Sequence, residues 1–212
     1  MIENQLTNFN KRISGTKFAC SLTLLVFLAS SCRLIVPQLY GGTLNLPPGP
    51  GDGTEYDAIG YELYKGNGFA FDWQDIGFRA PYIAHNNKEG TYYRVVLSKT
   101  RSSGPTAYRP PMLPVIIAGS HVLFKRQFWP IRIVNIAFVA LAVSVTFFGI
   151  SKQLGSLPGL IGAIYLLSQS SVQEYSHEIM TEAGALLLTT ALLFPLYKLI
   201  KEKKIDTPLF WD

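Results

Sequence analysis

Charged side chains are scarce in this sequence. Only 16% of its 212 residues are Asp, Glu, Lys or Arg, and 48% are hydrophobic, whereas about a quarter of the residues in an ordinary soluble domain are charged. Residues 131–150 contain a single charged side chain, Arg132, and residues 153–173 contain none. Because such segments must be buried on every side, the composition excludes an ordinary soluble domain and predicts an integral membrane protein.

Cysteine is also nearly absent. Cys20 and Cys32 both fall within the first apolar segment, where they offer neither a disulfide framework for the rest of the chain nor the spacing of metal ligands. A basic face with interleaved aromatic side chains is missing as well, although the formal net charge is +5. The Lys and Arg residues lie mainly beside apolar segments, so their distribution indicates membrane topology, and no nucleic-acid partner is predicted.

Long apolar runs are what the sequence does have. We predict an all-α, polytopic membrane protein with four to five apolar helices and a long non-cytoplasmic first loop that carries short juxtamembrane helices. The predicted regions are a cytoplasmic N-terminus at 1–17, a transmembrane helix at 18–36, the loop at 37–110, membrane helices within 111–200 and a cytoplasmic tail at 201–212. Within 111–200 we expect an interfacial helix at 111–124 and spanning helices at 131–150, 155–172 and 182–199. We expect this multi-pass protein in the plasma or inner membrane.

The number of crossings depends on residues 112–124. This apolar run has about 13 residues, which is too few to span a bilayer unaided. If it lies in the interface, four helices cross, and Lys152 and the lysines of residues 198–204 join the N-terminus on the cytoplasmic side, as the positive-inside rule requires. If it crosses, five helices do, and the final lysines lie outside. Four crossings are preferred, and five remain an alternative.

The first apolar segment has a second interpretation. Residues 28–32 resemble a lipoprotein cleavage site, which would make the segment a signal peptide ending at Cys32. However, Ala29 stands where a larger aliphatic residue is usual, and more membrane helices follow. We therefore predict that the segment stays attached as a transmembrane helix, with Arg33 reaching the headgroups near its outer end.

The loop contains one helical pattern. Tyr56, Ile59, Leu63 and Tyr64 recur at helical spacing after a cluster of Pro and Gly, and residues 66–68, Gly-Asn-Gly, supply a stop signal. The pattern predicts a short amphipathic helix, which we expect at the membrane surface. At its start, Asp52 is followed three residues later by Glu55. On spacing alone this pair has the form of a capping box.

Three glutamates follow the third spanning segment. Glu174, Glu178 and Glu182 are spaced at i, i+4 and i+8, which would place them along one face of a continuous helix, with His177 between them. Such a set could hold a divalent ion only if the helix packed against Asp52. A solvated helix end is the plain alternative, but Glu182 stands at the boundary to lipid-like residues, where an acid is a functional candidate.

Two short motifs connect the loop with the membrane helices. The string Asp52-Gly53-Thr54-Glu55-Tyr56 continues through Ala58, Leu63 and Gly66-Asn67-Gly68-Phe69. Downstream, Arg109-Pro110-Pro111-Met112-Leu113-Pro114 leads into an apolar run, and it is followed in order by Leu123-Phe124, Arg132 and Thr181-Glu182. By spacing alone, Arg109 could simply anchor a helix to phospholipid headgroups.

In order and spacing these motifs resemble the GT-C membrane glycosyltransferases that use a polyprenyl-phosphate sugar, in the family 39 branch that contains protein O-mannosyltransferases and the aminoarabinose transferase of lipid A. The resemblance covers most of residues 18–200. Two features depart from it. Gly53 replaces the second acid that is frequent in the family's Asp-Glu motif, and the chain ends after four or five helices where family members continue, which suggests an N-terminal portion.

The resemblance implies a role for each candidate residue. Asp52 would be the catalytic base and Arg109 would hold the carrier phosphate. Glu182 would be the second catalytic residue, orienting the acceptor or Asp52 or helping to hold a metal. The further residues expected to bind substrate are Tyr56, Glu55 and His177. A divalent cation is the one cofactor left open. The expected partners are the bilayer, a polyprenyl-phosphate sugar and a glycan, lipid or protein acceptor.

The resemblance therefore predicts a glycosyltransferase that moves a sugar from a polyprenyl-phosphate carrier to an acceptor on the non-cytoplasmic face. A non-catalytic membrane subunit or a relic of such an enzyme is the alternative. A transporter component is a weaker alternative, because that class places its polar groups near the bilayer midplane, whereas here they cluster in the loop and at helix ends.

Overall fold

The computed structural model describes residues 2–49, 51–89 and 102–202. The described residues form eight helices and two short strands. In chain order the elements are α1 (Ile2–Tyr40), α2 (Asp52–Lys65), β1 (Ala70–Phe71), α3 (Ile76–Glu89), β2 (Gly104–Pro105), α4 (Met112–Phe124), α5 (Trp129–Leu154), α6 (Ser156–Ser168), α7 (Ser170–His177) and α8 (Glu182–Glu202).

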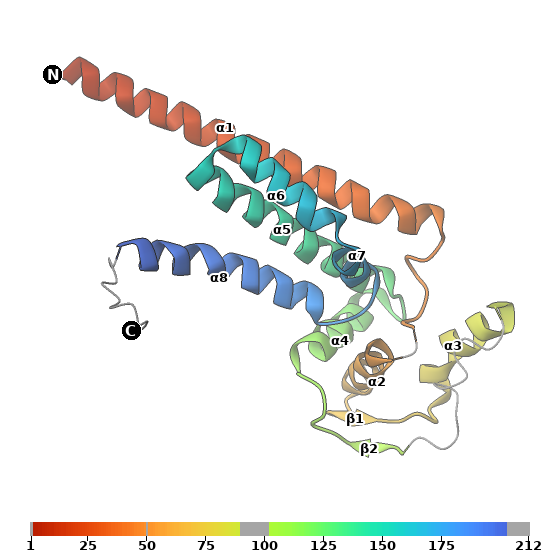
Figure 1. Ribbon diagram of the computed structural model, residues 1–212. Coiled ribbons are helices and arrows are strands. Elements are labelled where there is room, and N and C mark those ends of the chain that lie inside the picture. The colour runs from red at the N-terminus through yellow and green to blue at the C-terminus, as the bar shows by residue number, and fades with distance from the viewer. Residues whose placement is uncertain (1, 50, 90–101, 203–212) are drawn as a thin grey trace, which may run out of the picture.

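Helices α1, α5, α6 and α8 form an apolar bundle in which α5 is central (Figure 1). Val139 and Val143 of α5 are buried inside it, whereas Leu25 of α1 and Leu188 of α8 are more than half exposed. A bundle with apolar side chains both inside and outside suits a lipid environment, since lipid makes no demand for a polar surface. The start of α1, the turn between α5 and α6 and the end of α8 all lie at one end of the bundle (Figure 1).

Two of the described helices are long and apolar enough to cross a membrane: Phe18–Tyr40 within α1, and α5. Met112–Phe124, Ser156–Ser168 and Glu182–Tyr197 are apolar but shorter. These lengths are consistent with an all-α membrane protein. The count of four or five crossings remains a prediction.

A smaller group of α2, α3, α4 and the two strands covers the other end of the bundle (Figure 1). Strands β1 and β2 pair antiparallel, with Phe71 opposite Gly104. Helix α2 packs closely on α4 at Gly60, where an added Cβ would lie 2.5 Å from Ile117 Cγ2 and 3.1 Å from the Pro114 carbonyl oxygen. Glycine is needed there because a larger residue would push the two helices apart.

The predicted loop helix is confirmed. Helix α2 ends at Gly66, whose backbone is left-handed with φ 84°, and the Gly66 N–H donates to the Leu63 carbonyl. Its Tyr56 and Ile59 are buried against α4 and its neighbours. The protein itself therefore covers the apolar face of this helix, and its expected place at the membrane surface remains a prediction.

The segment from 155 to 182 differs from its prediction. A single helix over 155–172 is interrupted, because α6 ends at Ser168 and α7 begins at Ser170. The continuous face of Glu174, Glu178 and Glu182 is also wrong, since α7 ends at His177 and α8 begins at Glu182. Like charges four residues apart disfavour helix, and Asn135 of α5 donates to the backbone carbonyls of Glu178 (2.6 Å) and Met180 (3.5 Å), which supports the break.

Candidate active site

The N-terminus of α2 builds a charged site with Arg109, which precedes α4. The cap residue is Gly51, with φ 131° and ψ −150°, and no side chain caps the helix. The capping-box interpretation of Asp52 and Glu55 is therefore wrong. Both carboxylates instead point to Arg109, more than fifty residues away in the sequence.

Arg109 holds the two carboxylates together. Its Nη1 donates to Asp52 Oδ2 at 2.8 Å, its Nη2 pairs with Asp52 Oδ1, and its Nε donates to Glu55 Oε2 at 2.8 Å. A second ion pair joins Nη2 to Glu55 Oε2 at 2.7 Å. The planar fork of a guanidinium suits two such partners, and the same fork binds phosphate.

Two tyrosine rings flank the guanidinium. The Arg109 Cζ lies 4.7 Å from the ring centre of Tyr108 and 5.4 Å from that of Tyr56. The Arg109 side chain is 14% exposed, whereas that of Asp52 is 50% exposed. Burial alone would lower the pKa of Arg109, but the hydrogen bonds that it donates to Asp52 and Glu55 raise the pKa above its ordinary value. Arg109 is thus a fixed cation with an accessible carboxylate beside it.

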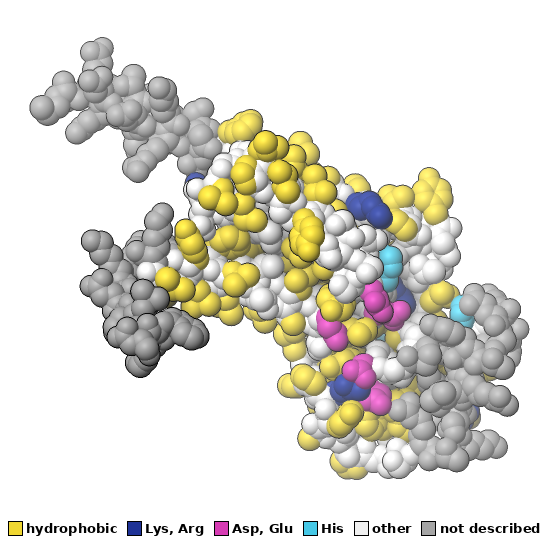
Figure 2. All heavy atoms as spheres, in the orientation of Figure 1, with side chains coloured by type: hydrophobic (Ala, Val, Ile, Leu, Met, Phe, Trp, Pro, Cys, Tyr) yellow, Lys and Arg dark blue, Asp and Glu magenta, His cyan; other side chains and the backbone are white. Residues whose placement is uncertain are grey.

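The link between α7 and α8 lies against the same end of α2. An added Cβ at Gly53 would be 3.1 Å from the Ile179 carbonyl oxygen, and the Tyr56 hydroxyl is 3.4 Å from Thr181 Oγ1. Thr181 immediately precedes Glu182, the first residue of α8. Glu182 Oε2 is buried and has no hydrogen-bond partner among the described residues. Acidic side chains gather at this end of the molecule (Figure 2).

Arg132 fixes the same link from α5. It is the single charge of the predicted apolar segment, and it is buried. Its Nε donates to the His177 carbonyl at 2.8 Å, and its Nη1 donates to the carbonyls of Leu44 (3.2 Å) and Leu46 (2.5 Å). The charge is therefore used to hold backbone from two loops in place.

His177 does not join the Arg109 site through any described contact. Its ring lies beside the Leu34 backbone of α1, and burial lowers its pKa below the ordinary value. Glu174, Glu178 and Glu182 were expected to hold a divalent ion only if their helix packed against Asp52. Among the described residues, the one group of three or more potential metal ligands lies elsewhere. The assignment of His177 as a substrate-binding residue remains a prediction.

Helix α2 also contributes Asp57 to an ion pair that the sequence did not predict. Asp57 is fully buried and accepts from Arg126 Nη1 at 2.5 Å, from Arg126 Nη2 at 2.6 Å and from the Tyr82 hydroxyl at 2.7 Å. His121 Nε2 is 3.5 Å from the same carboxylate. Burial alone would raise the pKa of Asp57, but Arg126 and the His121 hydrogen bond bring it well below the ordinary value. No local signal could have found this pair, since its members are 69 residues apart.

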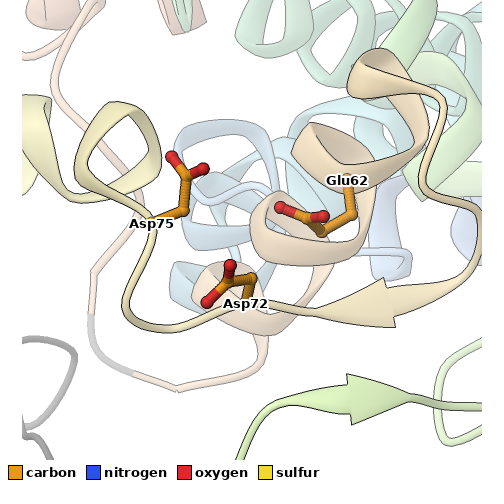
Figure 3. A group of neighbouring side chains, drawn as sticks. All are labelled: Glu62, Asp72 and Asp75. Atoms are coloured by element: carbon orange, nitrogen blue, oxygen red, sulfur yellow. The ribbon is translucent and has the colours of Figure 1, made fainter.

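A third acidic group lies at the other end of α2. Glu62, Asp72 and Asp75 each offer one oxygen, and these oxygens lie within 4.8 Å of one another (Figure 3). Glu62 belongs to α2, and the two aspartates follow β1. These are the described residues that could hold a metal ion.

An apolar helical bundle with acidic side chains gathered at one end (Figure 2) is typical of a membrane protein with a polar site at the end of its helices. Residues 108–210 match the family model described as dolichyl-phosphate-mannose-protein mannosyltransferase. The match confirms the resemblance to the GT-C glycosyltransferase superfamily and supports a glycosyltransferase in general. It includes Arg109 and Glu182, whereas Asp52 lies before it. Neither the curated proteins nor the solved structures provide a match.

Proposed function

We propose that this protein transfers a sugar from a polyprenyl-phosphate carrier to an acceptor on the non-cytoplasmic face of the membrane. The observation that carries the proposal is the Arg109 site, in which one guanidinium contacts Asp52 and Glu55 between two tyrosine rings. The family match at residues 108–210 supports the same reaction class.

Arg109 is the group that would bind the carrier phosphate. Arginine binds phosphate through two parallel hydrogen bonds, and in the free protein the Asp52 carboxylate occupies that same fork. A phosphate would therefore compete with Asp52 for Arg109. Donor binding would release the half-exposed Asp52 from its partner at the point where the reaction needs a base.

The transfer itself follows from these two groups. The acceptor oxygen forms a bond to the anomeric carbon of the sugar, and the bond from that carbon to the phosphate oxygen breaks. Asp52 takes the proton of the acceptor, and the departing phosphate keeps the bonding electrons as negative charge, which Arg109 stabilises. The phosphate leaves without protonation.

The remaining assigned residues would position the reactants. Glu182, at the start of α8, would orient the acceptor, since its Oε2 is buried without a described partner. Glu55 would keep Arg109 in place when Asp52 is released, and the buried Tyr56 ring beside Arg109 would hold the guanidinium in position for the donor.

The orientation is supported by the placement of the helix ends. The start of α1, the α5–α6 turn and the end of α8 lie together, opposite α2 and α4 (Figure 1). A cysteine at exposed Ala84 of α3, in a protein whose Cys20 and Cys32 are replaced by serine, should react in intact cells with a membrane-impermeant thiol reagent. A cysteine at exposed Ser156, the first residue of α6, should react only after lysis. The reverse pattern would contradict the orientation.

The function is tested in membranes from cells that express the protein, with a panel of polyprenyl-phosphate sugars and detection of sugar transfer and of released polyprenyl phosphate. Transfer that requires the protein and is lost in Asp52→Asn would support the proposal. Binding of the donor without transfer would favour a non-catalytic subunit. Solute flux without transfer would favour a transporter component.

A further inference from the structure

The acidic group formed by Glu62, Asp72 and Asp75 lies apart from the Arg109 site. Glu62 follows Asp52 by ten residues on α2, which is about 15 Å along a helix axis. Glu62 packs within the protein, with 3% of its surface exposed, and its carboxylate points towards the two aspartates of the turn after β1 (Figure 3). The group therefore joins α2 to the start of α3.

One oxygen of Glu62 has no hydrogen-bond partner among the residues that the structure describes. Its Oε2 accepts a hydrogen bond from Asn67 Nδ2 at 2.7 Å, whereas its Oε1 is buried and accepts none from any described residue. A buried carboxylate oxygen without a partner is costly, and Asp72 and Asp75 add two more negative charges beside it. Lys65 supplies a single positive charge, with its Nζ 2.5 Å from Asp75 Oδ2.

The aspartates are held in place by their own backbone. Asp72 Oδ1 accepts from the Gln74 N–H at 3.0 Å, and Asp75 Oδ1 accepts from the Phe78 N–H at 2.8 Å. These hydrogen bonds fix both carboxylates in the turn before α3.

We infer that Glu62, Asp72 and Asp75 bind a calcium ion that fastens α2 to the turn before α3. Three carboxylates form an all-oxygen donor set, which suits a hard divalent cation rather than zinc or copper. The three oxygens lie within 4.8 Å of one another, close enough for one ion to contact all of them. Several protein carboxylates favour calcium, which binds through many oxygens in flexible geometry, whereas Mg²⁺ keeps several waters and usually takes only one or two carboxylates.

In the free protein, the Lys65 ammonium occupies part of the site where the calcium ion would bind. Its ammonium lies beside Asp75, and its pKa is raised by that hydrogen bond. Bound calcium would compete with it for the same carboxylate. Lys65→Met should therefore strengthen calcium binding, whereas Glu62→Gln should weaken it. Opposite signs from neighbouring substitutions cannot arise from a general loss of folding.

The test is calorimetric titration of the purified, detergent-solubilised protein with CaCl₂, and separately with MgCl₂. One Ca²⁺ should bind per chain, more tightly than Mg²⁺. Loss of a hydrogen-bond partner of a metal ligand typically lowers metal affinity roughly 10- to 100-fold. Glu62→Gln removes a ligand itself, so calcium affinity should fall by at least that much. Asp72→Asn, at a less buried position, should act in the same direction if Glu62→Gln does not fold. Exposed Glu174→Gln is the matched control and should change nothing.

Calcium should also protect the folded protein. The midpoint of thermal unfolding should rise with added CaCl₂ and fall with chelator, and this response should be lost in Glu62→Gln and kept in Glu174→Gln. Absence of saturable Ca²⁺ binding, or equal binding by Glu62→Gln and the parent protein, would overturn the inference. Neither readout depends on sugar transfer, so this site and the proposed function are tested separately.

Discussion

Helix α2 carries two arginine–carboxylate pairs that differ in burial. Asp57 is fully buried, and Arg126, Tyr82 and His121 surround its carboxylate. Asp52, five residues earlier, has half of its side chain exposed and is paired with Arg109 at the rim. The same chemistry thus serves two purposes, because a buried pair with all its partners fixes structure, whereas an accessible pair can exchange one partner for a substrate.

The two arginines also differ in the aromatic rings beside them. The Arg126 guanidinium lies 4.7–5.4 Å from the ring centres of Tyr61, Phe78 and Phe128, so aromatic residues enclose it. Arg109 has rings on only part of its surface and contacts the end of α2 that meets the α7–α8 link. The two arginine side chains are about equally exposed, at 14% for Arg109 and 18% for Arg126. The pairs therefore differ in their carboxylates, because Asp52 is half exposed and can give way to a phosphate, whereas Asp57 is fully buried.

The largest effect expected on activity comes from Asp52→Asn. An amide is not a useful base at neutral pH, and loss of a positioned base typically costs about 10²- to 10⁴-fold in rate. Stability should change little, because an exposed ion pair contributes roughly 0–1 kcal/mol and Arg109 retains Glu55. The measurements are the rate of sugar transfer and the thermal midpoint. A variant that transfers sugar at the parent rate would show that Asp52 is not the base.

Asp57→Asn should reverse that pattern. It leaves the Arg126 charge without its buried partner, and removal of one member of a buried pair costs about 3–5 kcal/mol. Expression level and the thermal midpoint in detergent should fall strongly, well below those of Asp52→Asn. If both variants lost the same stability, the distinction between a structural pair and a functional pair on α2 would fail.

Arg109→Ala should chiefly weaken use of the donor. Hydrogen bonds to charged groups contribute about 1.5–3 kcal/mol, which corresponds to roughly a 10- to 100-fold change in affinity. The effect should appear in the KM for the polyprenyl-phosphate sugar more than in that for the acceptor. Arg109→Lys is the matched control, since it keeps the charge but loses the planar fork, and it should recover only part of the affinity.

Gly60→Val tests the scaffold that both pairs share. The added side chain would meet Ile117 and the Pro114 carbonyl, and overpacking of this kind costs about 1–3 kcal/mol. The thermal midpoint should fall, and donor affinity should fall with it, because α4 follows directly from Arg109. Gly119→Ala on α4, where nothing lies within 4 Å of an added Cβ, is the control and should leave stability equal or higher.

The smallest expected effect is that of mild acid on the buried pair. The pKa of Asp57 in the folded protein is lowered below its ordinary value, so its contribution is present above the unfolded pKa of about 3.9 and is lost as pH falls through the folded pKa. The difference in thermal midpoint between the parent and Asp57→Asn should therefore stay constant from about pH 7 to pH 5. A difference that shrinks within that range would contradict the lowered pKa.

Local pattern was enough to predict several elements. The helical spacing of Tyr56 and Ile59 with the stop at Gly66 predicted α2, and the apolar run of residues 112–124 predicted α4 with its observed bounds. In both cases neighbouring residues decide the structure. The break between His177 and Glu182 was not predicted, because side chains of α5, distant in the sequence, satisfy the backbone groups that it exposes.

The sequence by itself determined the apolar helices, the polar segment between them and the order of motifs that resembles the family. These depend on composition and on spacing within one segment. Only the tertiary structure decided that Asp52 and Glu55 bind Arg109 instead of capping α2, that Asp57 binds Arg126, and that Glu62 meets two aspartates across a turn. Each of these contacts joins different elements. The partner of each carboxylate is decided by how the helices pack, and the residues next to the carboxylate in the sequence do not indicate it.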